Sequence, residues 1–137
     1  MTLSALRDDA LFTAGDGFAL RVGLPWIRSL PLASLLDVEV TVDGARVHPL
    51  TIELGDRVVD PPALTHETGW WFLQDRVVLR GSPRLDAGAH RVAVSFRLAV
   101  PYLQTGLDGP LTLPFHIERT LVLDAAASAP TVSRDVA

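Results

Sequence analysis

The chain has 137 residues, of which 48 % are hydrophobic and 20 % are charged. This composition indicates one globular domain and excludes a disordered chain. The formal net charge is −4 and the basic residues are scattered arginines, so the sequence lacks the basic patch of a nucleic-acid-binding protein. Cysteine is absent, which excludes disulfides and thiolate metal sites. The amino-terminal residues lack the apolar stretch of a secretory signal or membrane span, so we expect a cytoplasmic protein without membrane contact.

The first half of the chain opens with two predicted strands. Apolar and other side chains alternate over residues 18–24 and again over residues 37–42, which buries one face of each strand. The connection between these two strands is too apolar for a solvated loop, so we expect it to pack against another apolar surface. Asp43 and Gly44 then predict a tight hairpin turn into residues 45–47, because both residues tolerate positive φ.

Further short strands follow in order. We expect strands at residues 50–54, 57–59, 70–73 and 76–80, a loop at 60–62, and a loop or single helical turn at 63–69. The clearest strand spans residues 90–100, and we expect Pro101 to end it. A loop at 103–110 and strands at 111–113 and 116–123 complete the list.

This succession of short strands predicts an all-β fold, an antiparallel β-sandwich. The pattern fits a jelly-roll or an immunoglobulin-like sandwich equally well. We expect residues 1–124 to form the single domain and residues 125–137 to form a flexible carboxy-terminal tail, because the tail is small, polar and without a period.

Titratable residues form no recognisable catalytic or metal-binding motif. None of the four histidines lies at metal-ligand spacing from another. His66 and Glu67 are adjacent, but neighbouring side chains on an extended chain point apart. We interpret His90 as a packed or hydrogen-bonded residue and His116 as a strand-surface residue. The sequence therefore predicts no catalytic residue and no metal ligand in this chain.

The aromatic residues are the better candidates for a functional surface. Trp26 and Tyr102 each follow a proline at the end of a long predicted strand, and we expect the two to project from the same edge of the sandwich. Tryptophan, tyrosine and arginine are frequent anchors of interfaces. We therefore predict Trp26, Arg28, Trp70 and Tyr102 as partner-interface or substrate-proximal residues. The alternative is that such aromatic residues close the ends of the sandwich, which we favour for Trp71 and Phe72.

Two stretches of the chain resemble a known family. The first is GDGFALRVGLPWIRSLPLASLLDVEVTVDGARV at residues 15–47. It is followed by the strand that contains Trp70 and by LDAGAHRVAVSFRLAVPYL at residues 85–103. Together they resemble the small β subunit of bacterial C-glycoside deglycosidases, in which a GFxxxVRxPxYRGxPLS-like run precedes an acidic strand that ends in VDG. Trp26 and Ile27 stand where that family usually has tyrosines.

The resemblance implies a β-sandwich subunit that works only with a larger α subunit. That partner is similar to sugar-phosphate isomerases and is expected to be a TIM barrel that holds a divalent metal, Mn²⁺. The implied reaction is a lyase cleavage of the carbon–carbon bond between sugar and aromatic aglycone in a 3-keto C-glycoside. It would proceed by proton abstraction next to the ketone and elimination. The base and the metal ligands would belong to the α subunit, so this chain alone is expected to be inactive and to need no cofactor.

A non-enzymatic carbohydrate-binding or protein-interaction module is the alternative hypothesis. A free-standing module of that kind is expected to be secreted and to carry a flat row of aromatic residues on one strand face. Here the aromatic residues stand at strand ends and no secretory signal is recognisable. Both observations favour the accessory subunit.

Overall fold

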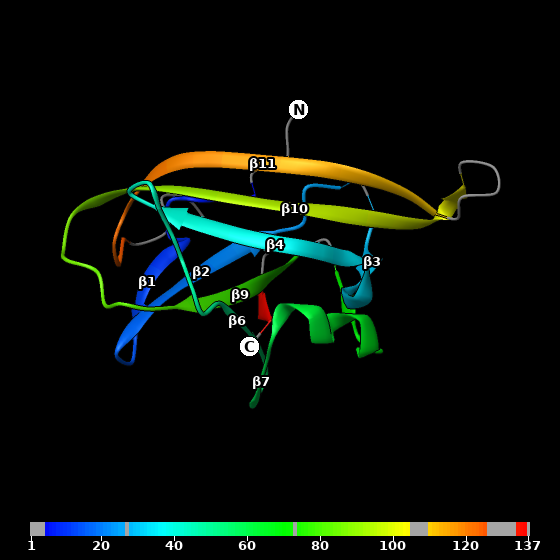
Figure 1. The fold of residues 1–137 in the computed structure, drawn as a ribbon, viewed down its shortest axis with the longest axis horizontal. Helices are drawn as coiled ribbons and strands as arrows, with labels where there is room; N and C mark the ends of the chain where they lie inside the picture. Colours follow the sequence, from blue (N-terminus) through cyan, green and yellow to red (C-terminus); the bar gives the residue numbers. More distant parts are fainter. Residues whose placement is uncertain (1–4, 27, 73, 105–109, 126–133, 137) are drawn as a thin grey trace.

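The computed structural model describes residues 5–26, 28–72, 74–104, 110–125 and 134–136, with the backbone alone for 101–104, 110 and 134–136. Two antiparallel sheets face each other (Figure 1), which confirms the predicted all-β sandwich. The β9 sheet has the order β1 (Leu11–Ala14), β2 (Gly17–Gly23), β9 (Asp75–Gly81), β6 (Thr51–Leu54) and β7 (Arg57–Val59). The β10 sheet has the order β11 (Pro110–Val122), β10 (Ala89–Gln104), β4 (Leu35–Val42) and β5 (Ala45–Arg46). A separate two-stranded ribbon pairs β3 (Leu30–Pro31) with β8 (Trp70–Trp71).

The hydrophobic core lies between the two sheets and follows the alternation seen in the sequence. Alternate side chains of each long strand point inward and are buried. The core residues on the inward faces of the central strands include Phe18, Leu20 and Val22 of β2, Val77 and Leu79 of β9, and Val92, Val94, Phe96 and Leu98 of β10. The predicted hairpin turn is also confirmed, since Asp43 and Gly44 have φ values of 52° and 85°. The local pattern therefore places the main strands correctly.

Proline does not end strands where we expected it to. β10 continues through Pro101 to Gln104, and its register with β11 shifts between Val100 and Gln104, where the ladder is already irregular. The strands expected at 111–113 and 116–123 form one strand, β11, which contains Pro114. β11 is the edge strand of its sheet, and an edge strand accommodates proline because the missing N–H can face away from the ladder.

The segment around the double proline is helical rather than a loop. η2 (Pro61–His66) is a 3₁₀ helix whose first residues are Pro61 and Pro62. Proline is tolerated there because the first helical N–H groups have no partner within the helix. A second 3₁₀ helix, η1 (Leu32–Ser34), precedes β4.

Two further predictions differ from the structure in extent. The strand expected at 70–73 is limited to β8, and Leu73 lies outside the described residues. β12 (Arg134–Val136) pairs in parallel with β9, so the segment expected to be a flexible tail includes a short strand. Residues 126–133 of that tail lie outside the described residues.

The amino-terminal segment at residues 5–10, here called the strap, runs along the edge of β2. The amides of Arg21 and Gly23 donate to the carbonyls of Ala10 and Ala5, each over 2.8 Å. Ala5 and Ala10 are buried and belong to the core. The strap thus extends the β9 sheet beyond β1.

Arginines from both sheets hold the strap in place. Arg119 of β11 donates to the carbonyl of Leu6 over 2.7 Å and pairs with the carboxylate of Asp8. Arg76 of β9 donates to Asp9 over 2.8 and 3.3 Å. The strap therefore links the two sheets, because it bonds to β2 and β9 of one sheet and to β11 of the other.

Candidate interaction surface

At β8, two exposed aromatic residues flank a buried tryptophan. β8 pairs with β3, so Trp70 and Trp71 point to opposite sides. Trp71 is 1 % exposed and its indole N–H donates to the carbonyl of Asp75 over 3.2 Å. Trp70 is 50 % exposed and Phe72 is 46 % exposed. The buried ring confirms the core interpretation of Trp71. The same interpretation is wrong for Phe72, which follows β8 and lies at the surface. The exposed Trp70 and Phe72 add apolar surface of the kind found at interaction sites.

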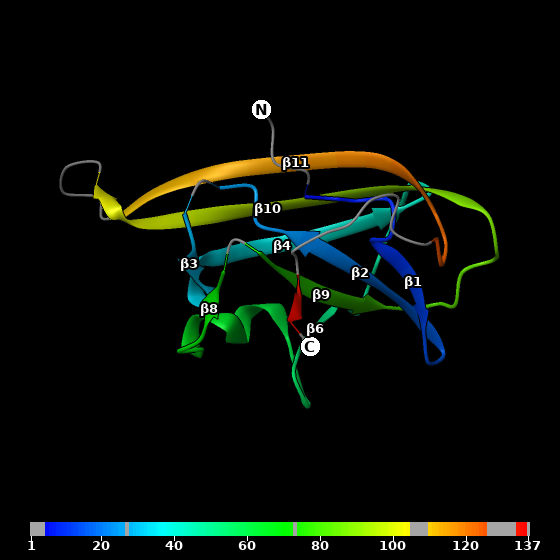
Figure 2. The same ribbon diagram turned by 180° about the vertical axis from the view of Figure 1, so that it is seen from behind.

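The other predicted interface residues lie differently. Trp26 is partly buried and packs against the core, whereas Arg28 is exposed. Tyr102 lies in the backbone of β10, but its side chain is outside the described residues. β3, β8 and the ends of β10 and β11 that pair at Gln104 and Pro110 lie toward one end of the sandwich (Figure 2). Contact of these four residues with a partner stays a prediction.

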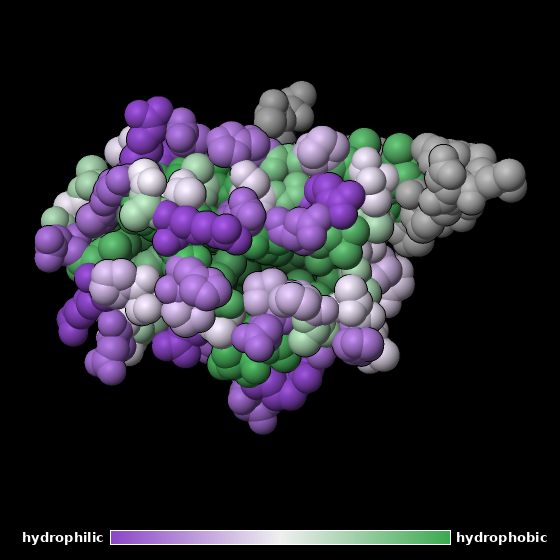
Figure 3. Space-filling view, in the orientation of Figure 1, coloured by the Kyte–Doolittle hydropathy of each residue, from purple (hydrophilic) through white to green (hydrophobic). Residues whose placement is uncertain are grey.

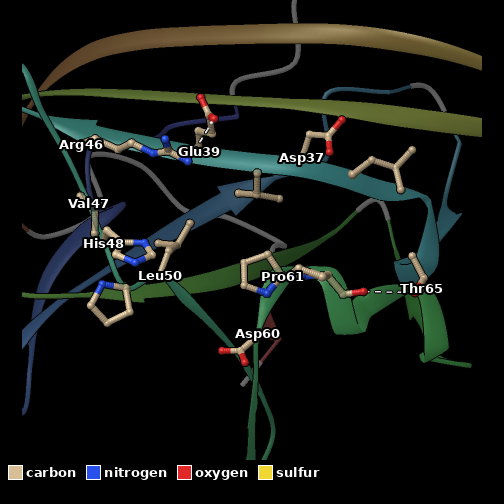
Figure 4. A pocket seen from close by; sticks show the side chains of 13 residues that line it. Asp37, Glu39, Arg46, Val47, His48, Leu50, Asp60, Pro61 and Thr65 are labelled. Carbon is tan, nitrogen blue, oxygen red and sulfur yellow. Dashed lines mark hydrogen bonds and ion pairs between the residues drawn. The ribbon is translucent and has the colours of Figure 1, made fainter.

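An open groove lies between β4 and η2, along the side of the sandwich. Its volume is about 810 Å³. Figure 3 shows apolar residues along its floor and hydrophilic residues along both rims. Figure 4 shows the side chains that line it, with Asp37 and Glu39 on β4 and Asp60 and Pro61 on the opposite side. The lining residues are Leu36, Asp37, Val38, Glu39, Arg46, Val47, His48, Pro49, Leu50, Asp60, Pro61, Pro62 and Thr65.

Ion pairs neutralise most of the charge on the β4 rim of the groove. Arg97 lies 2.6 Å from Asp37, and Arg46 lies 3.3 Å from Glu39. Asp60, on the other rim, has a carboxylate that no hydrogen bond or ion pair engages within the described part of the chain. Sequence reasoning missed this groove, because its two walls are separate in the sequence and only the Asp60-Pro61-Pro62 signal marked one of them.

His90 lies at the start of β10 and joins two turns. Its Nδ1 lies 2.7 Å from Oδ2 of Asp43, and its Nε2 lies 2.6 Å from the carbonyl oxygen of Asp86. Asp43 also accepts a hydrogen bond from the amide of Arg91 over 2.9 Å. Because both ring nitrogens face acceptors, only the imidazolium can donate to both. The Asp43 hydrogen bond, and then the Asp86 carbonyl, raise the pKa of His90. The interpretation of His90 as a hydrogen-bonded residue is confirmed.

The raised pKa of His90 predicts that stability falls as the solution becomes alkaline. The stability that protonated His90 adds to the folded state is fully present below the unfolded-state pKa of about 6.5. It is lost as pH rises through the folded-state pKa. Thermal unfolding measured between about pH 5 and pH 9 checks this, and His90→Gln should flatten the dependence. His48→Gln, which removes an exposed histidine outside both turns, should keep it. If His90→Gln leaves the pH dependence of thermal unfolding unchanged, His90 is not the group that causes it.

The remaining titratable side chains are dispersed over the surface. The hydroxyl of Ser95 lies 2.7 Å from Nδ1 of His116 on the outer face of the β10 sheet, which confirms that His116 is a strand-surface residue. Glu67 accepts two hydrogen bonds from Arg57, of 2.7 and 3.2 Å, and these bonds lower the pKa of Glu67. No group of three or more His, Cys, Asp or Glu side chains among the described residues could hold a metal ion. Within the same residues, no helix has the length and apolar character needed to span a membrane.

Several curated proteins are similar to the chain over most of its length, although no family model matches it. A C-glycoside deglycosidase beta subunit from Arthrobacter globiformis is 33 % identical over 121 residues, which cover 85 % of this chain and 92 % of that protein. A 3'-dehydrocarminate deglycosidase beta subunit from a Microbacterium species is 34 % identical over 99 residues, or 69 % of this chain and 75 % of that protein. A C-glycoside deglycosidase beta subunit from Microbacterium trichothecenolyticum is 34 % identical over 102 residues, or 72 % and 78 %.

Proposed function

The chain belongs to the family of C-glycoside deglycosidase β subunits, and from this membership we propose that it is the accessory subunit of a lyase that cleaves 3-keto C-glycosides. The observation that carries the proposal is the match to the Arthrobacter subunit along 92 % of that protein. The name of the Microbacterium relative, a 3'-dehydrocarminate deglycosidase, supports an oxidised C-glycoside as the substrate class.

The chemistry is assigned to the partner of this chain. We propose an α subunit that resembles sugar-phosphate isomerases, a TIM barrel with a divalent metal such as Mn²⁺. A base removes the proton on the sugar carbon next to the ketone. The electron pair of the carbon–carbon bond then leaves with the aromatic aglycone, which takes up a proton. The described residues of this chain contain no three-ligand cluster, which supports placing the metal in the α subunit.

The alternative of a free-standing carbohydrate-binding module has less support. Such modules stack sugars on a flat row of aromatic residues. The outer face of the β10 sheet instead carries ion pairs, among them Arg91 with Glu118 at 2.8 Å and Arg97 with Asp37 at 2.6 Å. The exposed aromatic residues Trp70 and Phe72 lie on the separate β3–β8 ribbon.

Co-expression tests the proposed function. We expect this chain to co-purify with an isomerase-like α subunit from the same organism, and the complex to release the aglycone from a 3-keto C-glucoside. The isolated chain should be inactive in the same assay. Turnover by the isolated chain, or failure of the two proteins to associate, would contradict the proposal.

Replacing the exposed Trp70 with alanine should weaken assembly without unfolding the chain. An aromatic anchor at the centre of an interface typically contributes about 2–4 kcal/mol, a loss of roughly thirty- to a thousandfold in affinity on truncation. The measurement is paired: the affinity for the α subunit and the melting temperature of the isolated chain. Ser82→Ala, an exposed change outside the β3–β8 ribbon, is the control. If Trp70→Ala binds the α subunit as tightly as wild type does, Trp70 is not part of the interface.

A further inference from the structure

A histidine holds two connecting segments together at one end of the sandwich. The imidazole of His90, the second residue of β10, lies between the β4–β5 turn at residues 43–44 and the loop at residues 82–88, which leads from β9 into β10. Figure 1 shows this loop and this turn at the end of the sandwich that lies away from β3 and η2. The side chain of His90 is 11 % exposed, so water offers the ring few other partners.

The β4–β5 turn is attached to β10 by hydrogen bonds that do not depend on the charge of His90. The amide of Asp43 donates to the carbonyl of Arg91 over 2.8 Å, and the amide of Arg91 donates to Oδ1 of Asp43 over 2.9 Å. Oδ2 of the same carboxylate lies 2.7 Å from Nδ1 of His90. A carboxylate is a stronger acceptor than a carbonyl, so a neutral ring with one proton keeps that proton on Nδ1.

The loop, in contrast, depends on the other ring nitrogen. Nε2 of His90 lies 2.6 Å from the carbonyl oxygen of Asp86. When the imidazolium loses the Nε2 proton, two acceptors face each other and the hydrogen bond becomes a repulsive contact. On either side of this contact, Leu85 packs against the core and the carbonyl of Gly88 accepts from the amide of Leu123 over 2.9 Å. Deprotonation therefore acts on the residues between these two anchors.

The charged groups around the ring favour its doubly protonated form. The hydrogen bonds to Asp43 and to the Asp86 carbonyl raise the pKa of His90, burial lowers it, and the charges of Asp43 and Asp86 raise it further. The other residues beside the ring on these elements are Arg84 of the loop, whose charge acts on Asp124, Arg91 on the opposite face of β10, and Leu121, which pairs with His90 from β11. Both carboxylates therefore act in the same direction.

We propose that His90 is a pH-operated latch: the imidazolium ties the 82–88 loop to the β4–β5 turn, whereas the neutral ring keeps Asp43 and releases the chain at Asp86 and Ala87. The opening is local, because β4, β10 and β11 pair through backbone groups that do not titrate. The latch goes beyond a loss of overall stability at alkaline pH, since it identifies the contact that breaks and the contact that stays. It concerns the isolated chain and does not depend on the proposed function.

A spin label tests the release directly. The sequence has no cysteine, so Ala87→Cys introduces a single thiol, at an exposed position, to carry a nitroxide. As pH rises from about 5 to about 9, the mobile fraction in its electron paramagnetic resonance spectrum should grow roughly tenfold, with one midpoint above about 6.5. Adding His90→Gln should abolish this change. The same label at Asp56→Cys, in the exposed β6–β7 turn, should keep one spectrum throughout.

Nitrogen NMR of the wild-type chain identifies the ring atom that keeps the proton. In the alkaline form, Nδ1 of His90 should be protonated and Nε2 should be bare. If Nε2 keeps the proton, the Asp86 contact survives and the latch is overturned. It is also overturned if the label at position 87 is equally mobile at both ends of the pH range. A parallel change in the label at position 56 overturns it as well, because the whole chain is then unfolding.

Discussion

Replacing Trp71 with alanine should lower the free energy of unfolding of the isolated chain by about 3–5 kcal/mol, because the side chain is fully enclosed. Its ring lies 6.3 Å from the ring of Phe96, between centroids, and its N–H donates to the carbonyl of Asp75. Truncation leaves a cavity and removes the hydrogen bond to the Asp75 carbonyl. For a domain of this size the melting temperature should fall by roughly 10–20 °C. Thermal and urea unfolding of the isolated chain measure the effect.

The neighbouring residue supplies a matched control for this experiment. Trp70→Ala removes the same side chain from an exposed position and should change the stability by less than about 0.5 kcal/mol. Trp71→Phe, which keeps an aromatic ring but removes the donor, should fall between wild type and Trp71→Ala. If Trp71→Ala were as stable as Trp70→Ala, the Trp71 side chain would not be buried in the core as described.

Removing the carboxylate of Asp9 should produce the second large loss of stability. The side chain of Arg76 is 6 % exposed and that of Asp9 is 15 % exposed. Asp9→Ala leaves the guanidinium of Arg76 buried without this carboxylate, which typically costs about 3–5 kcal/mol. Urea unfolding of Asp9→Ala measures the change. Asp16→Ala, in the exposed β1–β2 turn, is the control and should unfold like wild type.

Removing both partners should recover much of that loss. In Asp9→Leu combined with Arg76→Met, neither member of this ion pair is left without the other, and such paired replacements are often neutral. If the double variant and Asp9→Ala are equally destabilised, the loss comes from a disturbed strap and not from breaking the ion pair between Asp9 and Arg76.

Acid should also weaken this ion pair. Burial raises the pKa of Asp9, but the hydrogen bond and the charge of Arg76 outweigh it, so the folded-state pKa lies below its usual range. The contribution of Asp9 is present above the unfolded-state pKa of about 3.9 and is lost as pH falls through the folded-state pKa. Asp9→Ala should therefore show a smaller loss of stability on acidification than wild type.

The strands could be predicted because their signals are local. Alternation over residues 18–24 and 90–100 reports burial of one face, and Asp43-Gly44 reports a turn that needs positive φ at both residues. Proline was misleading, because its effect depends on whether a strand is central or at an edge. That property belongs to the sheet order, which places β11 at an edge and which no local pattern reveals.

The candidate surface could be predicted only in part, because its residues meet through the fold. The sequence indicated Trp70 as a candidate surface residue and Trp71 as a core residue, but it placed Phe72 in the core as well, and the exposure of Phe72 depends on how the chain leaves the β3–β8 ribbon. The groove depends on β4 and η2, which the chain brings together across β5, β6 and β7. The pair formed by Arg76 and Asp9 likewise joins distant segments. Contacts of this kind require the tertiary structure.

The order of strands in the β10 sheet also determines when the groove can exist during synthesis. β4 leaves the ribosome well before β10, its partner in the ladder from Leu35 to Val42, because β5 to β9 lie between them in the chain. Closing so long a loop is entropically slow, and the pairing forms only after the distant strand has been made. One wall of the groove therefore reaches its final form only after β10 has been synthesised and has paired with β4.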